Sequence, residues 1–210
     1  MQLPRFYPIL DTALLEQRGF ALLEAAGILL AEGVRLVQLR HKGHYSRDLF
    51  GMAETLALRC REQGATLIIN DRADIAMLLN AGLHIGQEDL PPADARRLLG
   101  PGRVLGFSTH GEEQFVRALG EPVDYLAVGP IFATTSKSNP DPVVGVELLR
   151  TVRRLTDRPL VAIGGVTRRT ARDVLAAGAN AVAVIGDLYP EPLTRRSLEE
   201  SIREWLAATT

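Results

Sequence analysis

Short apolar runs alternate with longer amphipathic stretches along the whole chain. The apolar runs are four to eight residues long and mostly rich in Val, Ile and Leu, which is typical of strands buried on both faces. We place strands at residues 6–10, 34–40, 65–70, 83–86, 103–108, 125–132, 160–165 and 181–186. The amphipathic stretches between them predict helices, for example over residues 22–33, 46–64, 73–82 and 168–178. Several of these stretches end in a glycine that we expect to cap a helix C-terminus: Gly33, Gly64, Gly82 and Gly178.

This alternation of strands and helices predicts a parallel sheet, because parallel neighbours need a crossover connection. Eight such units favour a closed (β/α)8 TIM barrel. The rival is an open, doubly wound sheet, which usually carries a glycine-rich turn after its first strand. Here the first strand leads into DTALLEQRG (11–19), which has no such turn. We therefore predict a single-domain barrel over residues 1–210, with short loops at roughly 26 residues per unit.

Charge and composition narrow the class of partner. The chain has 24 Lys and Arg against 25 Asp and Glu, so no basic field would attract nucleic acid or anionic lipid. Its single cysteine, Cys60, cannot form an internal disulfide, and we expect a buried, inert thiol. Because no signal-peptide pattern or membrane-spanning run is present, we expect a cytoplasmic protein with no membrane partner. The oligomeric state stays open, a homo-oligomer included.

Function in such a barrel lies where strands end and loops begin, and the second strand ends in cations. Gln38, Arg40 and Lys42 alternate along it, so their side chains would share one direction. Two cations and an amide make a good diphosphate clamp. A solvated strand end is the alternative interpretation when this pattern is taken alone.

Two carboxylates follow the next two strands. Asp71 comes after the third strand and Asp89 after the fourth, so the two can approach each other at the rim of the barrel. Carboxylates that leave room for waters and phosphate oxygens are how proteins usually hold Mg2+. The alternatives are a helix N-cap for Asp71 and a turn residue for Asp89. The nearby clamp residues favour a metal–diphosphate site.

The later strand ends add polar side chains. Ser108 could donate to a phosphate or a polar ring, and His110 could do acid–base work or begin a helix. The longest loop follows the sixth strand, where the hydroxyls of Thr134 and Ser136 beside Lys137 suit anion binding.

Glycines follow the last two strands. Gly165 and Gly186 would let backbone N–H groups come close to phosphate oxygens, at the recurrent phosphate site of this fold. Tight turns are the alternative explanation for both.

Taken together, these motifs resemble the thiamine phosphate synthase family. The resemblance runs in order from about residue 34 to 188, through VQLRHK (37–42), LIINDRADIA (67–76), LHIGQEDLP (83–91), GFSTH (106–110), DYLAVGPIFATTSK (124–137), VAIGGV (161–166) and AVAVIG (181–186). It implies a transferase that joins 4-amino-2-methyl-5-(diphosphooxymethyl)pyrimidine to 4-methyl-5-(2-phosphooxyethyl)thiazole with the help of Mg2+. Diphosphate and thiamine phosphate would be released.

The resemblance also implies roles for individual residues. Asp71 and Asp89 would be the magnesium ligands. The pyrimidine diphosphate would contact Gln38, Arg40, Lys42, Asn70, Ser108 and Lys137. The thiazole phosphate would contact Thr134, Ser136, Gly165, Ile185 and Gly186. We expect the catalytic groups to be Arg40, Lys42, Ser108 and Lys137, and we add His84 of the fourth strand as a substrate-binding candidate.

Departures and competing functions accompany this resemblance. Ser136 replaces the usual Thr and keeps the hydroxyl, whereas Gly186 stands where Ser is common and offers only its backbone N–H. One alternative is the related thiazole tautomerase, which needs no magnesium–diphosphate apparatus. Another is a non-catalytic barrel that binds a thiamine precursor.

Overall fold

The computed structural model describes residues 2–134 and 141–210, and these form one closed barrel of eight parallel strands in the order β1 to β8. The strands are β1 (Phe6–Asp11), β2 (Leu36–Arg40), β3 (Thr66–Asn70), β4 (Gly82–Ile85), β5 (Leu105–Thr109), β6 (Tyr125–Val128), β7 (Leu160–Ile163) and β8 (Ala181–Val184). Pairing of β1 with β8 closes the sheet. The predicted (β/α)8 barrel is therefore confirmed.

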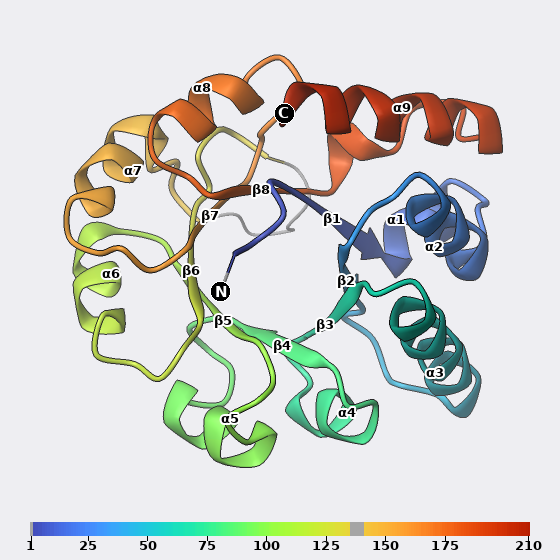
Figure 1. Ribbon diagram of the computed structural model, residues 1–210, viewed down its shortest axis with the longest axis horizontal. Helices are drawn as coiled ribbons and strands as arrows, with labels where there is room; N and C mark the ends of the chain where they lie inside the picture. Colours follow the sequence, from blue (N-terminus) through green and yellow to red (C-terminus); the bar gives the residue numbers. More distant parts are fainter. Residues whose placement is uncertain (1, 135–140) are drawn as a thin grey trace.

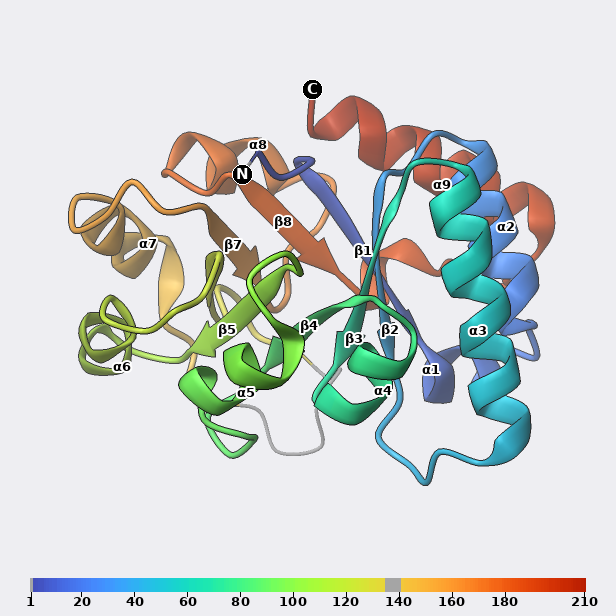
Figure 2. The same ribbon diagram turned by 60° about the horizontal axis from the view of Figure 1, so that its bottom comes forward.

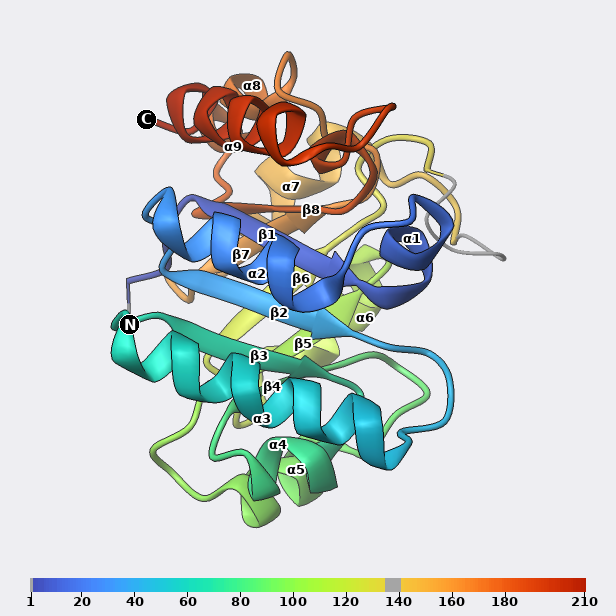
Figure 3. The same ribbon diagram turned by 90° about the vertical axis from the view of Figure 1, so that its right-hand side faces the viewer.

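Helices surround the barrel on the outside (Figure 1). They are α1 (Thr12–Gln17), α2 (Leu22–Ala31), α3 (Arg47–Glu62), α4 (Ala73–Leu78), α5 (Pro92–Leu99), α6 (Glu112–Ala118), α7 (Gly145–Arg153), α8 (Ala171–Ala176), the 3-10 turn η1 (Gly186–Leu188) and α9 (Arg195–Ala208). Figure 3 shows α9, α2 and α3 lying side by side on the outside of the barrel, where α2 packs on β1 and α3 on β3. Within the described residues, no helix combines the length and apolar character needed to cross a bilayer.

Apolar side chains fill two separate layers, which explains why the strands have almost no polar alternation. One layer lies inside the barrel and includes Ile9, Ile68 and Val161. The other lies between the barrel and its helices, where Phe6 stacks on Trp205 with ring centroids 5.6 Å apart. Because a barrel strand is buried on both faces, both of its faces are apolar.

The helix ends correct one expectation. Gly33, Gly64 and Gly178 have positive φ after their helices, as expected, but Gly82 lies in β4. The left-handed residue after α4 is Asn80, with φ of 53°. Gly82 is required for a different reason, since a Cβ there would lie 2.5 Å from the Ile68 side chain. Its neighbour across the sheet, rather than a helix end, selects the glycine.

Element bounds shift where local chemistry intervenes. The sixth strand was expected to run to residue 132 but ends at Val128, because Pro130 has no N–H to continue the ladder. Cys60 is buried on α3, as expected, and burial raises the pKa of its thiol to about 11. Figure 2 shows β5, β7 and β8 running from the side of the C-terminus toward the opposite side. The loops that follow the strands gather on that opposite side.

Candidate active site

The three side chains predicted to form a clamp lie at different depths of the barrel mouth. Gln38 is buried, and its Nε2 donates to the Tyr7 hydroxyl at 2.9 Å. Arg40 forms an ion pair with Asp11, and both side chains are mostly buried. Lys42 lies at the rim. The exposure of these three side chains therefore increases along β2 and beyond it, from buried Gln38 to exposed Lys42.

The two predicted metal ligands come together at the rim. Asp71 follows β3, and its carboxylate accepts from Lys42 Nζ at 2.5 Å. Asp89 follows β4, and its Oδ2 accepts from the Gly86 backbone N–H at 2.7 Å. Burial raises the pKa of the Asp89 carboxyl, and the nearby charge of Asp71 raises it further against the lowering effect of the Gly86 hydrogen bond. The two carboxyl groups are therefore close enough for the ionisation of one to affect the other.

Backbone geometry excludes one interpretation of Asp71, the helix N-cap. Its φ is 63°, a left-handed conformation that is costly for a non-glycine residue. The residue at the N-cap of α4 is Arg72, and this helix start receives no side-chain cap. Asp71 is thus no N-cap, and its carboxylate points to the rim. Asp89, in contrast, does close a turn through Gly86, so the turn role expected as its alternative is present.

This pair fits a magnesium ion. Within residues 2–134 and 141–210, no group of three or more His, Cys, Asp or Glu side chains converges as a complete ligand cage. Mg2+ does not need one, because it keeps several waters and usually binds one or two carboxylates plus substrate phosphates. A divalent cation would also stabilise the charged form of Asp89, whose pKa is raised by burial and by the charge of Asp71.

Deeper in the mouth, polar groups from β3, β4 and β5 face one another. Asn70 is buried, and its Nδ2 has no hydrogen-bond partner within the described structure. Beside it on β4 is His84, whose Cα pairs with that of Asn70. His84 Nε2 lies 2.9 Å from Ser108 Oγ on β5. An unsatisfied buried amide donor costs stability, so Asn70 is suited to receive an acceptor from a ligand.

The loops after β6 and β7 are tied together by their backbones. Phe132 N donates to Gly164 O at 2.9 Å, and Gly165 has a φ of 65°. A Cβ at Gly165 would lie 2.4 Å from Ala133 O, so only glycine fits this crossing. Thr134 follows at the end of the described segment. Ser136 and Lys137, for which the sequence predicted binding roles, lie outside the described residues.

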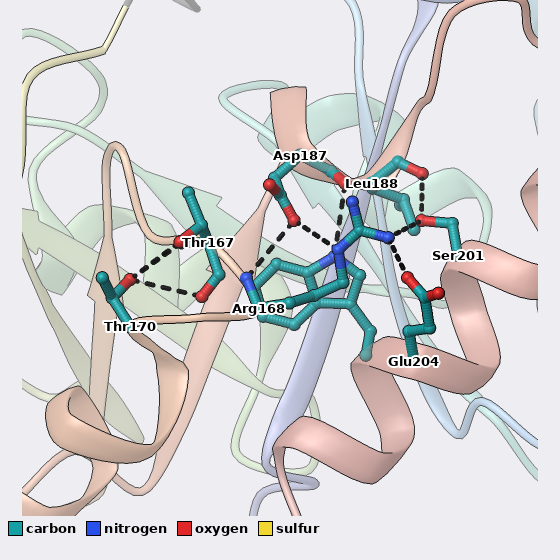
Figure 4. A network of polar contacts seen from close by, with 8 residues as sticks. Thr167, Arg168, Thr170, Asp187, Leu188, Ser201 and Glu204 are labelled. Atoms are coloured by element: carbon teal, nitrogen blue, oxygen red, sulfur yellow. Dashed lines mark hydrogen bonds and ion pairs between the residues drawn. The ribbon is translucent and has the colours of Figure 1, made fainter.

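The loop after β8 carries Ile185 and Gly186, which begins η1. Figure 4 shows the contacts between this turn and Arg168 of the β7–α8 loop. Arg168 Nε donates to Asp187 Oδ2 at 2.9 Å, and its backbone N–H donates to the same oxygen at 3.3 Å. The guanidinium also pairs with Glu204 of α9. One side chain therefore connects the ends of β7, β8 and the last helix.

His110 contacts backbone rather than the predicted clamp. Its Nδ1 lies 2.6 Å from Gly129 O and 3.5 Å from an Asp141 carboxylate oxygen. Its backbone N–H donates to Gln114 Oε1, at the start of α6. The helix-start role is therefore present, while the contact with Asp141 keeps acid–base work available.

Several residues of the site were missed from the sequence. Asp11 was not among the predicted site residues, although an acidic residue directly after a predicted strand was the available signal. Tyr7 and Tyr125 read as ordinary core residues, and both are fully buried. The Arg168–Asp187 pair joins two loops 19 positions apart, which no local pattern reports.

Known proteins share both the sequence and the fold. The family model described as thiamine monophosphate synthase matches residues 6–188. The chain belongs to the thiamine monophosphate synthase family. A relative from Koribacter versatilis, named thiamine-phosphate synthase, is 48% identical over 200 residues, covering 94% of each chain. A second one, from Chlorobium phaeovibrioides, is 42% identical and covers 82% of this chain and 83% of its own.

Solved structures agree with this family. The thiamine phosphate pyrophosphorylase from Pyrococcus furiosus superposes with a TM-score of 0.82 at 29% identity, covering 97% of this chain and 95% of that one. A KDPGal structure at 15% identity has a TM-score of 0.75, which is a likeness of fold alone. The resemblance to the thiamine monophosphate synthase family is thus confirmed, and with it the expectation of a transferase of thiamine biosynthesis.

Proposed function

We propose that the chain transfers the (4-amino-2-methylpyrimidin-5-yl)methyl group of 4-amino-2-methyl-5-(diphosphooxymethyl)pyrimidine to the ring nitrogen of 4-methyl-5-(2-phosphooxyethyl)thiazole. The bond between the methylene carbon and the diphosphate oxygen breaks, and its electron pair leaves with diphosphate. The thiazole nitrogen then supplies the pair that forms the new carbon–nitrogen bond. The products are thiamine phosphate and diphosphate, and no oxidant or reductant is needed.

One observation carries this proposal: the Asp71 and Asp89 carboxylates lie near each other at the rim, and Lys42 Nζ donates to Asp71. Such a cluster suits a divalent cation together with a polyanion, because each neutralises charge that the other brings. Asp71 and Asp89 would hold Mg2+. When bound, Mg2+ would withdraw charge from the diphosphate and make it a better leaving group.

Protein groups deeper in the mouth would orient the pyrimidine diphosphate. Asp11 fixes the orientation of the Arg40 side chain. Its remaining N–H donors can then bind phosphate oxygens without a further loss of side-chain freedom. The Asn70 amide offers a buried donor, and Gln38 and Ser108 add polar contacts. Stabilising the charge of a departing diphosphate is work for cations and donors, and it needs no protein nucleophile.

The thiazole phosphate would bind at the ends of β7 and β8. Gly165 allows close backbone approach there, and Ile185 and Gly186 contribute the neighbouring turn. Thr134 and Ser136 would add hydroxyl donors, and Lys137 would meet the departing diphosphate. These last assignments rest on the family resemblance.

Turnover tests the proposal directly. Purified protein is mixed with both substrates and Mg2+, and thiamine phosphate and diphosphate are quantified by chromatography. We expect stoichiometric products, and none when either substrate is left out or when EDTA is in excess. A protein that isomerises the thiazole alone would be the tautomerase, and one that binds both substrates without product would be the non-catalytic barrel.

A further inference from the structure

A line of polar side chains crosses the otherwise apolar interior of the barrel. Gln38 Nε2 donates to the Tyr7 hydroxyl at 2.9 Å, and the Tyr7 and Tyr125 hydroxyls lie 3.0 Å apart. The Tyr125 hydroxyl lies 2.9 Å from His84 Nδ1, and His84 Nε2 lies 2.9 Å from Ser108 Oγ. The line therefore joins two substrate-binding candidates, Gln38 and Ser108, through three buried rings.

Neighbouring strands make room for this line. Gly106 of β5 pairs with His84 on one side and with Tyr125 on the other. A Cβ at Gly106 would lie 2.0 Å from the Tyr125 ring, so only glycine lets that ring lie across β5. The Tyr125 and His84 rings stack with centroids 5.6 Å apart and an interplanar angle of 12°. The contact between them is thus built into the sheet.

The hydrogen bonds of this line have a direction. Burial raises the pKa of both tyrosines far above neutral pH, so each hydroxyl carries one hydrogen. Since Tyr7 accepts from the Gln38 amide, its own hydrogen goes to Tyr125. Tyr125 then donates to His84 Nδ1. A neutral imidazole that accepts at Nδ1 carries its hydrogen on Nε2, which donates to Ser108 Oγ.

We infer that Gln38, Tyr7, Tyr125, His84 and Ser108 form one directional hydrogen-bond chain that fixes His84 as the Nε2–H tautomer. Within the described residues, Ser108 Oγ has no other side-chain partner, so its hydroxyl hydrogen remains available to an acceptor on the ligand. Tyr7 and Tyr125 are positioning residues: they lie behind the site and set which atoms of it donate. The inference concerns the free protein and so goes beyond the proposed function.

The direction is testable because the opposite one predicts a different tautomer. If the Gln38 amide were turned, with its oxygen facing Tyr7, every donor along the chain would reverse. His84 would then carry its hydrogen on Nδ1 and accept from Ser108. The two arrangements differ in a single observable property of one ring.

The first experiment is NMR of the ligand-free protein with 15N-labelled histidine, in which the His84→Gln variant identifies the His84 signals. At neutral pH we expect hydrogen on Nε2 and a bare Nδ1. The Tyr125→Phe variant removes the donor to Nδ1 and should leave both tautomers populated. The Nδ1–H tautomer or an imidazolium in the wild type would overturn the inference, and so would an unchanged ring in Tyr125→Phe.

Tyr189→Phe is the matched control. Tyr189 is equally buried, and its hydroxyl donates to Ile9 O at 2.9 Å, outside the chain. This variant also loses a buried tyrosine hydroxyl, together with its hydrogen bond to Ile9, but should keep the wild-type His84 signals. If it changed them as Tyr125→Phe does, the effect would be general loosening of the barrel, which would contradict the inference.

Binding of the pyrimidine diphosphate, followed by calorimetry, tests the ligand half. We expect Tyr125→Phe to weaken binding by about tenfold, the worth of one well-placed buried hydrogen bond, and Tyr189→Phe to leave it unchanged. Wild-type affinity in Tyr125→Phe would show that the Ser108 donor is not used by the ligand. A wild-type protein that ignores this ligand would refute the proposed function, while the NMR result would still decide the tautomer.

Discussion

The orientation of the Arg40 side chain is fixed by Asp11 of the neighbouring strand β1. Asp11 at the end of β1 accepts both from the Arg40 guanidinium and from the Leu14 backbone N–H in the first turn of α1. The carboxylate thus keeps a buried cation aimed at the mouth of the barrel. An arginine held this way presents a planar set of donors that a lysine cannot reproduce.

Substitution of Arg40 should therefore weaken diphosphate binding even when the charge is kept. We expect Arg40→Lys to lose about tenfold in affinity for diphosphate with Mg2+, because the fork that matches phosphate oxygens is lost. Arg40→Ala should lose more. Calorimetry measures both, and the assignment of Arg40 to the clamp fails if both variants bind as the wild type does.

The carboxylate pair predicts a dependence on magnesium. Asp71→Asn and Asp89→Asn should each lower turnover by about 10²-fold, since removing one key electrostatic group commonly does so. Mg2+ should raise the melting temperature of the wild type and leave that of both variants unchanged. Asp74→Asn is the control: this nearby carboxylate pairs with Arg72 away from Asp89 and should keep full turnover. Equal losses in all three variants would contradict the metal assignment.

At the scale of elements, two loops and a helix are joined through one guanidinium. Arg168 follows β7, contacts Asp187 in η1 and pairs with Glu204 on α9. The Asp187 carbonyl in turn accepts from Trp205 Nε1 at 3.4 Å. The turn that begins at Gly186 is therefore held by these contacts in addition to its own backbone hydrogen bonds.

Loss of the Arg168 contacts should change the KM for one substrate only, the thiazole phosphate. We expect Arg168→Met to raise the KM for the thiazole phosphate by about tenfold with little change in kcat, because the turn loses its charged hydrogen bonds but touches no reacting atom. Arg169→Met is the matched control, since Arg169 is the exposed neighbour. Steady-state kinetics decides the matter. A change in kcat alone, or the same shift in the control, would rule out this positioning role.

At the scale of the whole molecule, α9 closes the outer layer where the chain returns to its first strand. Trp205 is fully buried and stacks on Phe6 of β1, and Arg203 on the same helix pairs with Glu32 after α2. The end of the chain thus stabilises its beginning. This arrangement shields the outer face of β1 from water, next to the β1–β8 pairing that closes the barrel.

Removing this ring should lower the stability of the entire barrel. Trp205→Ala should cost about 3–5 kcal/mol in the free energy of unfolding, as for other large aromatic truncations in cores. Trp205→Phe should cost less, because it keeps most of the stacking area. Urea unfolding followed by circular dichroism measures both. Near-wild-type stability in Trp205→Ala would mean that α9 contributes little to barrel closure.

The sequence by itself determined the elements and the rim. Eight apolar runs between amphipathic stretches predicted eight strands, since burial on both faces requires such runs. The parallel order then put every strand end on one face, so Asp71, Asp89 and Lys42 could be placed together before their contacts were known. Boundaries failed where neighbours intervened, as at Gly82.

Only the tertiary structure decided which groups meet across the barrel. A strand that is apolar on both faces carries no alternation to say which side chains point inward, so Tyr7 and Tyr125 read as core. Their contact joins residues 118 positions apart, and the Tyr125 ring also needs the space that Gly106 leaves in the neighbouring strand β5. The Arg40–Asp11 and Arg168–Asp187 pairs are likewise products of strand adjacency. Local pattern encodes burial and chain direction, whereas partners across a closed sheet follow from its register and closure.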